Sequence, residues 1–141
     1  MNAYAKSADS YLAQRILGAG PEQQAALLME AGQRYLGKAM KAMEQKDHFE
    51  ASNCLRRVTD IITESVLRLN AEDGGELVEN LFKLYDWWTR EILEAGAAKD
   101  TARLGNVSSS MGEIRQAWEQ LHEKQVRATQ DAGFQVGDRV I

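Results

Sequence analysis

Residues 81–93, LFKLYDWWTREIL, carry more large apolar side chains than one buried face of a helix holds. One set recurs at steps of three and four residues, the spacing of a buried helical stripe. Starting from Leu77, its members are Leu81, Leu84, Trp88 and Ile92. A second set lies roughly 120° further round the helix. It consists of Val78, Phe82, Tyr85 and Leu93. A helix in a bundle usually buries about one such stripe, so the second stripe needs a covering of its own.

Three interpretations account for the second stripe. A wide or irregular bundle buries both stripes. Alternatively, the ends of the chain cover the extra surface, and the candidates are YLAQRIL (residues 11–17) and GFQVGDRVI (residues 133–141). The third interpretation is that the surface binds the amphipathic helix of a partner protein. The second and third are compatible if a terminal segment covers the surface until a partner displaces it.

The rest of the chain shows helical spacing with clear start and stop signals. Pro21 suits the first turn of a helix that ends near Lys46. Asp47 is a typical N-cap for a second helix, which the turn NAEDGG (residues 70–75) ends. A third helix is expected from residues 75–76 to Ala95, with Gly96 as its left-handed stop.

A fourth helix is expected to start at a cap formed by Asp100 or Thr101. Its apolar residues alternate at steps of three and four, as in a coiled-coil seam. They are Leu104, Val107, Met111, Ile114, Trp118 and Leu121. Glycine and serine have low helix propensity, so residues 108–112 are expected to bend or fray.

Short connections between four amphipathic helices favour antiparallel neighbours. The expected fold class is therefore all-α, an antiparallel up-down four-helix bundle. Residues 1–20 are expected to form an N-terminal capping segment, residues 21–127 the bundle, and residues 128–141 a C-terminal tail.

Composition narrows the functional classes. The chain has 141 residues, with 21 acidic and 17 basic side chains and a formal net charge of -4. Nucleic-acid binders usually carry a basic patch, so a nucleic-acid partner is not expected. No stretch approaches the roughly 20 apolar residues of a membrane span. The first residues also lack an apolar run of signal-peptide length, so a cytoplasmic location without membrane insertion is expected.

The candidate catalytic residues are few. Glu119 and His122 form one Glu-x-x-His motif, but a di-iron site in a bundle needs two such motifs and further carboxylates. Glu119 is also expected to point away from the apolar seam. His48 is expected to be a solvated residue near a helix end, and Cys54 a small packing residue. No phosphate-binding or nucleophile motif is present. We therefore expect no enzyme, no metal and no cofactor.

Several short motifs occur in an order that resembles the FliS-type flagellar export chaperones. Tyr11 precedes a loop that ends in Pro21-Glu22, and a pair Tyr35-Leu36 follows in the first helix. The remaining motifs are Asp60-Ile61-Ile62, Gly74-Gly75-Glu76, Asn80-Leu81 and Leu84-Tyr85-Asp86. The resemblance covers residues 11–118.

The resemblance implies a cytoplasmic helical bundle that binds the disordered C-terminal segment of flagellin. Such a chaperone prevents premature polymerisation and delivers its client to the flagellar type III export gate. It also implies that the N-terminal segment covers part of the binding surface when no client is present. The second stripe would then be the client surface, with these expected partner-binding residues: Tyr11, Ile61, Val78, Leu81, Phe82 and Tyr85.

The chain departs from the family pattern in the first helix, where Met29 and Glu30 replace a tyrosine and an aspartate. The C-terminal GFQVGDRVI is not part of that pattern either. The alternative functions are an adapter bundle that binds a different amphipathic helix and a small helical enzyme, which the lack of a catalytic constellation disfavours.

Overall fold

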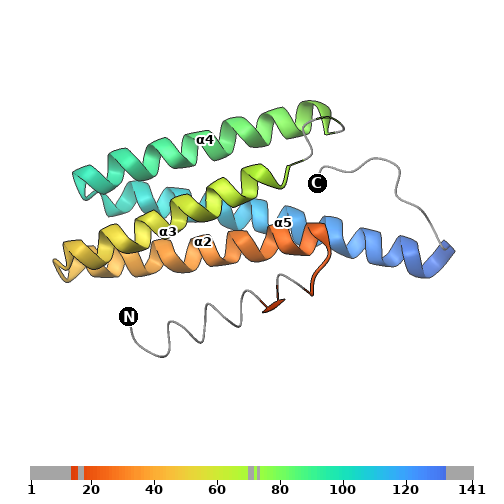
Figure 1. Cartoon of the computed structure of the whole chain (residues 1–141), viewed down its shortest axis with the longest axis horizontal. Coiled ribbons are helices and arrows are strands. Elements are labelled where there is room, and N and C mark those ends of the chain that lie inside the picture. The colour runs from red at the N-terminus through yellow and green to blue at the C-terminus, as the bar shows by residue number, and fades with distance from the viewer. Residues whose placement is uncertain (1–13, 16–17, 70–71, 73, 133–141) are drawn as a thin grey trace.

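The computed structural model describes residues 14–15, 18–69, 72 and 74–132, and four long helices account for most of these residues (Figure 1). They are α2 (Pro21–Glu44), α3 (His48–Leu67), α4 (Gly75–Ala98) and α5 (Thr101–Ala132). The described ranges contain no strand. The predicted all-α bundle is therefore confirmed. Among the residues described, no helix is both long enough and apolar enough to cross a membrane.

The helix starts follow the local sequence signals. Gly20 is extended at the N-cap of α2 and Pro21 occupies the first turn. The side chain of Asp47 accepts a hydrogen bond from the backbone N–H of Glu50 at 3.2 Å, which satisfies a free donor at the start of α3. Asp100 does the same for the backbone N–H of Arg103 in α5, also at 3.2 Å. The predicted caps at residues 47 and 100 are confirmed.

The end of α4 differs from the prediction. The helix continues through Gly96 to Ala98, and Lys99 takes the left-handed conformation with φ 56°. Gly96 has a packing role instead, because a Cβ atom there would lie 2.8 Å from Cδ1 of Leu55 on α3. The glycine leaves room for the end of the Leu55 side chain at this turn.

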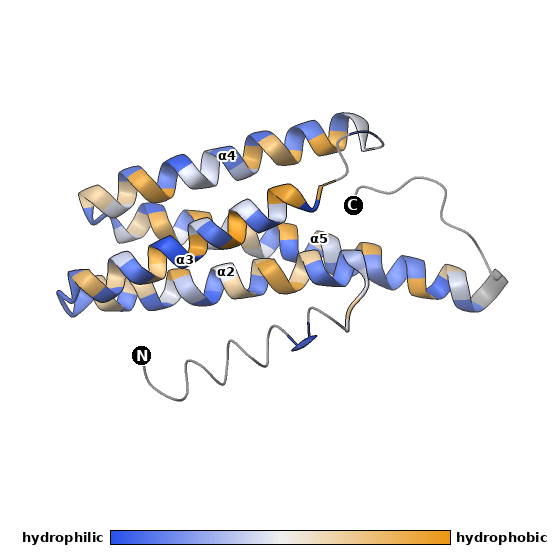
Figure 2. Cartoon of the chain, viewed as in Figure 1, coloured by the Kyte–Doolittle hydropathy of each residue, from blue (hydrophilic) through white to orange (hydrophobic). Residues whose placement is uncertain are grey.

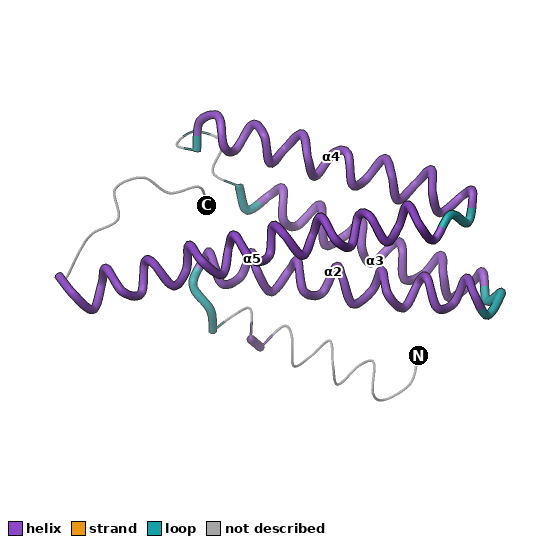
Figure 3. Tube along the Cα trace, turned by 180° about the vertical axis from the view of Figure 1, so that it is seen from behind, coloured by secondary structure: helices purple, strands orange, loops and turns teal. Residues whose placement is uncertain are grey.

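Helix α5 does not break at its run of small residues. The backbone carbonyl of Ser108 accepts a hydrogen bond from Nε2 of Gln33 at 3.0 Å, and Oγ of Ser110 accepts one from Nε1 of Trp88 at 2.9 Å. Residues 108–112 receive these contacts from α2 and α4 and stay helical, so the expected fraying is absent. The helix also continues beyond residue 127, where the tail was expected to begin, and extends past the other helices (Figure 3).

The helices pack as a closed ring in which α2 and α4 each contact both α3 and α5. The backbone of α2 packs more closely against α3 and α5 than the backbone of α4 does, because α2 buries small residues at these contacts. Its buried small residues are Ala25, Ala26, Ala31, Gly32, Ala39 and Ala42. A Cβ atom at Gly32 would lie 2.9 Å from Sδ of Met111, so a side chain there would require the end of Met111 to move.

Large aromatic side chains fill the space between α4 and the other helices. The rings of Tyr85 and Trp88 stack with centroids 4.8 Å apart, and Nε1 of Trp118 donates a hydrogen bond to the Tyr85 hydroxyl at 3.4 Å. Buried tyrosine and tryptophan usually need such partners for their polar atoms. Burial raises the pKa of the Tyr85 hydroxyl above its ordinary value. This cluster makes α4 part of the core and thereby fixes which of its residues remain at the surface.

Candidate functional site: an apolar groove between α3 and α4

The core face of α4 lies between the two apolar stripes expected from the sequence. Its buried residues are Val78, Leu81, Tyr85, Trp88, Ile92 and Ala95. The prediction that Val78 and Tyr85 lie outside the core is wrong, since each is only 1% exposed. The prediction that Leu77 starts the core stripe is also wrong, since it is 53% exposed, and Leu84 is only half-buried. Because α4 packs between α3 and α5, the middle of its wide apolar arc turns inward.

The two edges of this arc remain at the surface, and Figure 2 shows hydrophobic residues recurring along the whole of α4. Phe82 and Leu93 lie on the edge toward α3, where Phe82 is half-buried against the core and Leu93 is 65% exposed. Trp87 is partly exposed as well, but it lines no part of the hollow surface between α3 and α4. Among the described residues, the apolar surface beside α3 is the one that lines cavities between α3 and α4.

Two cavities follow one another between α3 and α4. The smaller, of about 260 Å³, is lined by Ile62, Thr63, Val66 and Leu67 of α3 and by Phe82, Tyr85, Asp86 and Thr89 of α4. The larger, of about 460 Å³, begins one turn nearer the N-terminus of α3 and the C-terminus of α4. Its lining residues are Met43, His48, Ala51, Ser52, Leu55, Arg56, Thr59, Ile92, Leu93, Gly96, Ala97 and Lys99. We call the two cavities together the α3/α4 groove, with a Phe82 end and a Lys99 end.

Comparison with known proteins identifies the family. The family model described as Flagellar protein FliS matches residues 3–125. The chain belongs to the FliS family. The flagellar secretion chaperone FliS of Vibrio cholerae is 32% identical over 122 residues, which are 86% of this chain and 87% of that protein. The flagellar secretion chaperone FliSB of Pseudomonas aeruginosa is 31% identical over 105 residues, 74% of this chain and 83% of the relative. The FliS chaperone of Salmonella typhimurium is 29% identical over 110 residues, 77% of this chain and 82% of the relative.

Membership of the FliS family confirms the resemblance, and the structure locates the predicted partner-binding residues relative to the groove. Phe82 and Tyr85 line its Phe82 end, although Tyr85 is almost wholly buried and forms the floor. Val78 and Leu81 belong to the core. Ile61 is half-buried on another side of α3, with Cγ2 only 3.8 Å from the Cβ position of Gly32.

Tyr11 lies outside the described residues, so its expected role stays a prediction. Leu67, which is 74% exposed, lines the groove but was missed. The sequence feature that could have identified Leu67 is its position at the C-terminal end of the apolar run of α3. Leu93 was placed in the second stripe but not among the binding residues. Both are exposed leucines on a FliS-family bundle, and both face the groove.

The remaining candidate residues have other partners. Glu119 lies on the exposed surface and pairs with Arg115 at 2.9 Å, so it points away from the core as expected. Among the described residues, no group of three or more histidine, cysteine, aspartate or glutamate side chains is arranged to hold a metal ion. Cys54 is buried, and its Sγ donates to Oε1 of Glu50 at 3.4 Å.

The Cys54 thiol is expected to be unreactive in the folded protein. Burial, with a smaller contribution from Glu50, raises its pKa to about 11, so the thiol is protonated at pH 8. The thiolate is the reactive form, and an ordinary cysteine has a pKa near 8.5. Reaction with a disulfide reagent at pH 8 should be slower by roughly a hundredfold in the native protein than in urea. Equal rates in the two states would contradict this environment.

Proposed function

We propose that the chain is a cytoplasmic chaperone of flagellar secretion and that it binds the disordered C-terminal segment of flagellin in the α3/α4 groove. Two observations support the proposal. The chain belongs to the FliS family, and relatives that match most of it are named flagellar secretion chaperones. The single structural observation that carries it is the run of apolar side chains that lines the two cavities between α3 and α4.

The mechanism follows from the burial of apolar surface. A segment that forms apolar contacts with neighbouring subunits in a filament exposes those same side chains before assembly. The groove offers a substitute apolar surface, and burial contributes about 25 cal/mol per Å². Ordering a disordered segment costs several kcal/mol in return. The net affinity is therefore moderate for the area buried, which suits a client that has to be released at the export gate.

The proposed roles of the binding residues follow their burial. Phe82 contacts the client directly and Tyr85 forms the floor beneath it, while Val78 and Leu81 support that floor from the core. Ile61 adds a contact only if the client extends onto the neighbouring side of α3.

Residues 1–20 are proposed to cover part of the binding surface in the absence of client. Deletion of residues 2–15 should then leave the bundle folded and tighten the binding of the flagellin segment. Loss of the circular dichroism signal of the folded bundle on deletion would show that the segment belongs to the core.

Co-purification with flagellin tests the proposed function. Tagged protein should retain full-length flagellin and should lose it when the C-terminal segment of flagellin is removed. Equal retention of the truncated flagellin would place the interaction elsewhere on the client. No retention of either form would favour an adapter that binds a different amphipathic helix.

A further inference from the structure

The Lys99 end of the α3/α4 groove combines an apolar floor with a basic rim. Three basic side chains, His48, Arg56 and Lys99, are among its lining residues, and no aspartate or glutamate is. Nζ of Lys99 donates a hydrogen bond to Nε2 of His48 at 3.4 Å, so the imidazole accepts, and Lys99 and Arg56 supply the positive charges of the rim. Because no carboxylate lines this end of the groove, the basic rim is available to bind an anionic group.

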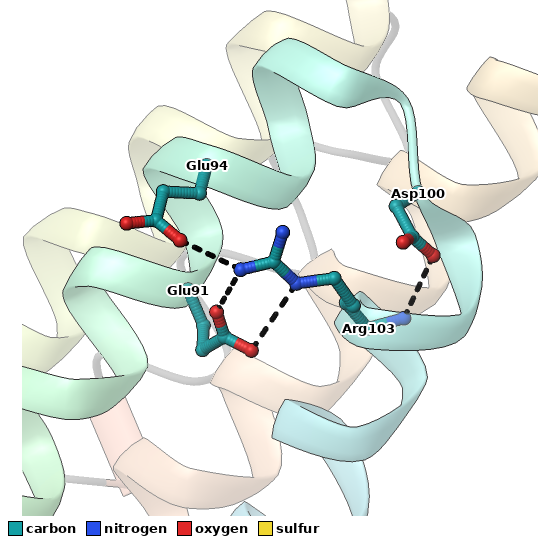
Figure 4. Close-up of polar contacts among 4 residues, drawn as sticks. All are labelled: Glu91, Glu94, Asp100 and Arg103. Carbon is teal, nitrogen blue, oxygen red and sulfur yellow. Dashed lines mark hydrogen bonds and ion pairs between the residues drawn. The ribbon is translucent and has the colours of Figure 1, made fainter.

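Four carboxylates near this end have other partners. Glu91 and Glu94 of α4 both accept hydrogen bonds from Arg103 of α5, the latter at 2.7 Å (Figure 4). Glu50 accepts from Cys54, and Asp47 caps the start of α3. These acidic groups therefore point to partners outside the groove.

The backbone holds the basic rim in place. His48 is the first residue of α3, directly after the Asp47 cap. Lys99 is the left-handed residue that ends α4, and its N–H bonds back to the carbonyl of Gly96 at 3.3 Å. The turn that follows is fixed by the Asp100 cap and by the ion pairs of Arg103 (Figure 4). A rim whose backbone is already ordered loses little entropy when a charged group binds to it.

The Phe82 end has a different electrostatic character. Its single charged lining residue is Asp86, whose carboxylate pairs with Arg90 at 3.1 Å. The groove is thus apolar along its length and basic at one end only.

We propose that the Lys99 end binds carboxylate side chains of the bound segment, so that an acidic amphipathic stretch lies over His48, Arg56 and Lys99 and a more apolar stretch lies over Phe82. This inference rests on the proposed function and adds the direction in which the segment lies. Burial of apolar surface has no direction, whereas charge pairs at one end select a register.

A purely structural role for Lys99 has a different consequence. A cation at the end of α4 interacts favourably with the helix dipole, so its loss would lower stability without changing binding. Binding and stability therefore need to be measured on the same variants.

The test uses the double variant Arg56→Glu/Lys99→Glu and a synthetic peptide of the flagellin C-terminal segment. Calorimetry at low salt should show about tenfold weaker binding than the wild-type protein shows, with little change in melting temperature. The affinity of the wild-type protein should fall as salt rises, and that of the variant should stay constant or rise. The control Lys124→Glu/Arg127→Glu makes the same change of charge at exposed positions on α5 and should bind like the wild type.

The outcomes separate the two proposals. If the groove variant binds as well as its control while Phe82→Ala weakens binding, the basic rim has no role and the proposed function stands. If neither variant weakens binding, the groove is not the client site. A peptide whose acidic residues are replaced by their amides should lose the salt dependence with the wild-type protein. Retention of that dependence would overturn the inference about the rim.

Discussion

Replacing Trp88 with alanine is expected to lower the free energy of unfolding by about 3–5 kcal/mol, the usual cost of truncating a buried aromatic side chain. Trp88 is wholly buried, stacks on Tyr85, and donates its indole N–H to Ser110 of α5. Its loss removes apolar contacts between α4 and the rest of the bundle and leaves a cavity. Urea denaturation followed by circular dichroism measures the change.

The adjacent Trp87 offers a matched control, because Trp87→Ala removes the same atoms from the same helix. Trp87 is 39% exposed and lies at the edge of the apolar arc of α4. Its truncation should cost much less, about 1 kcal/mol or below. Similar losses for the two variants would mean that α4 is rotated from the orientation described above.

Phe82→Ala is expected to weaken binding of the flagellin C-terminal segment by about 1–3 kcal/mol, as the loss of an anchor residue at an interface does. Phe82 is half-buried at the edge of the core and lines the α3/α4 groove. Its truncation should cost less stability than that of Trp88, because part of its ring is already in contact with water. Calorimetry with a flagellin peptide gives the change in affinity.

Trp87→Ala again provides the control, now for binding. It removes an exposed aromatic side chain of α4 that does not line the groove. Its affinity for the peptide should match that of the wild type. If Trp87→Ala weakens binding and Phe82→Ala does not, the client lies on another face of α4.

Much of the fold could be predicted from the sequence because local signals determine it. Asp47 and Asp100 cap their helices as their positions indicate. The apolar seam of α5 also faces the core, with Leu104, Val107 and Trp118 buried. A helix start or an apolar stripe depends on neighbours within one or two turns, so the spacing of residues is sufficient to predict it.

The errors arise where tertiary contacts decide between local alternatives. Gly96 has the chemistry of a helix stop, yet its lack of a side chain accommodates Leu55, and Lys99 ends the helix instead. Residues 108–112 of α5 have low helix propensity but stay helical, because Gln33 and Trp88 donate hydrogen bonds to this stretch from other helices. Neither contact can be derived from the spacing of residues along one helix.

The candidate site was predicted only in part for the same reason. The excess of apolar residues on α4 indicated more apolar surface than one face buries, and Phe82 and Leu93 line the α3/α4 groove. The spacing of residues along α4 could not show that Val78 and Tyr85 turn inward, because this depends on α4 packing between α3 and α5. Which residues of α3 line the groove, such as Leu67, depends on how α3 is rotated about its own axis relative to α4.

Photo-crosslinking from single positions tests most directly whether flagellin lies in the α3/α4 groove. A benzophenone amino acid is placed at Leu67, at Leu93 or at Leu77, three exposed leucines that tolerate a larger side chain. The first two line the groove, whereas Leu77 does not. Irradiation with the flagellin C-terminal segment should produce crosslinks from positions 67 and 93 and none from position 77. Crosslinks from position 77 alone would contradict the assignment of the groove as the client site.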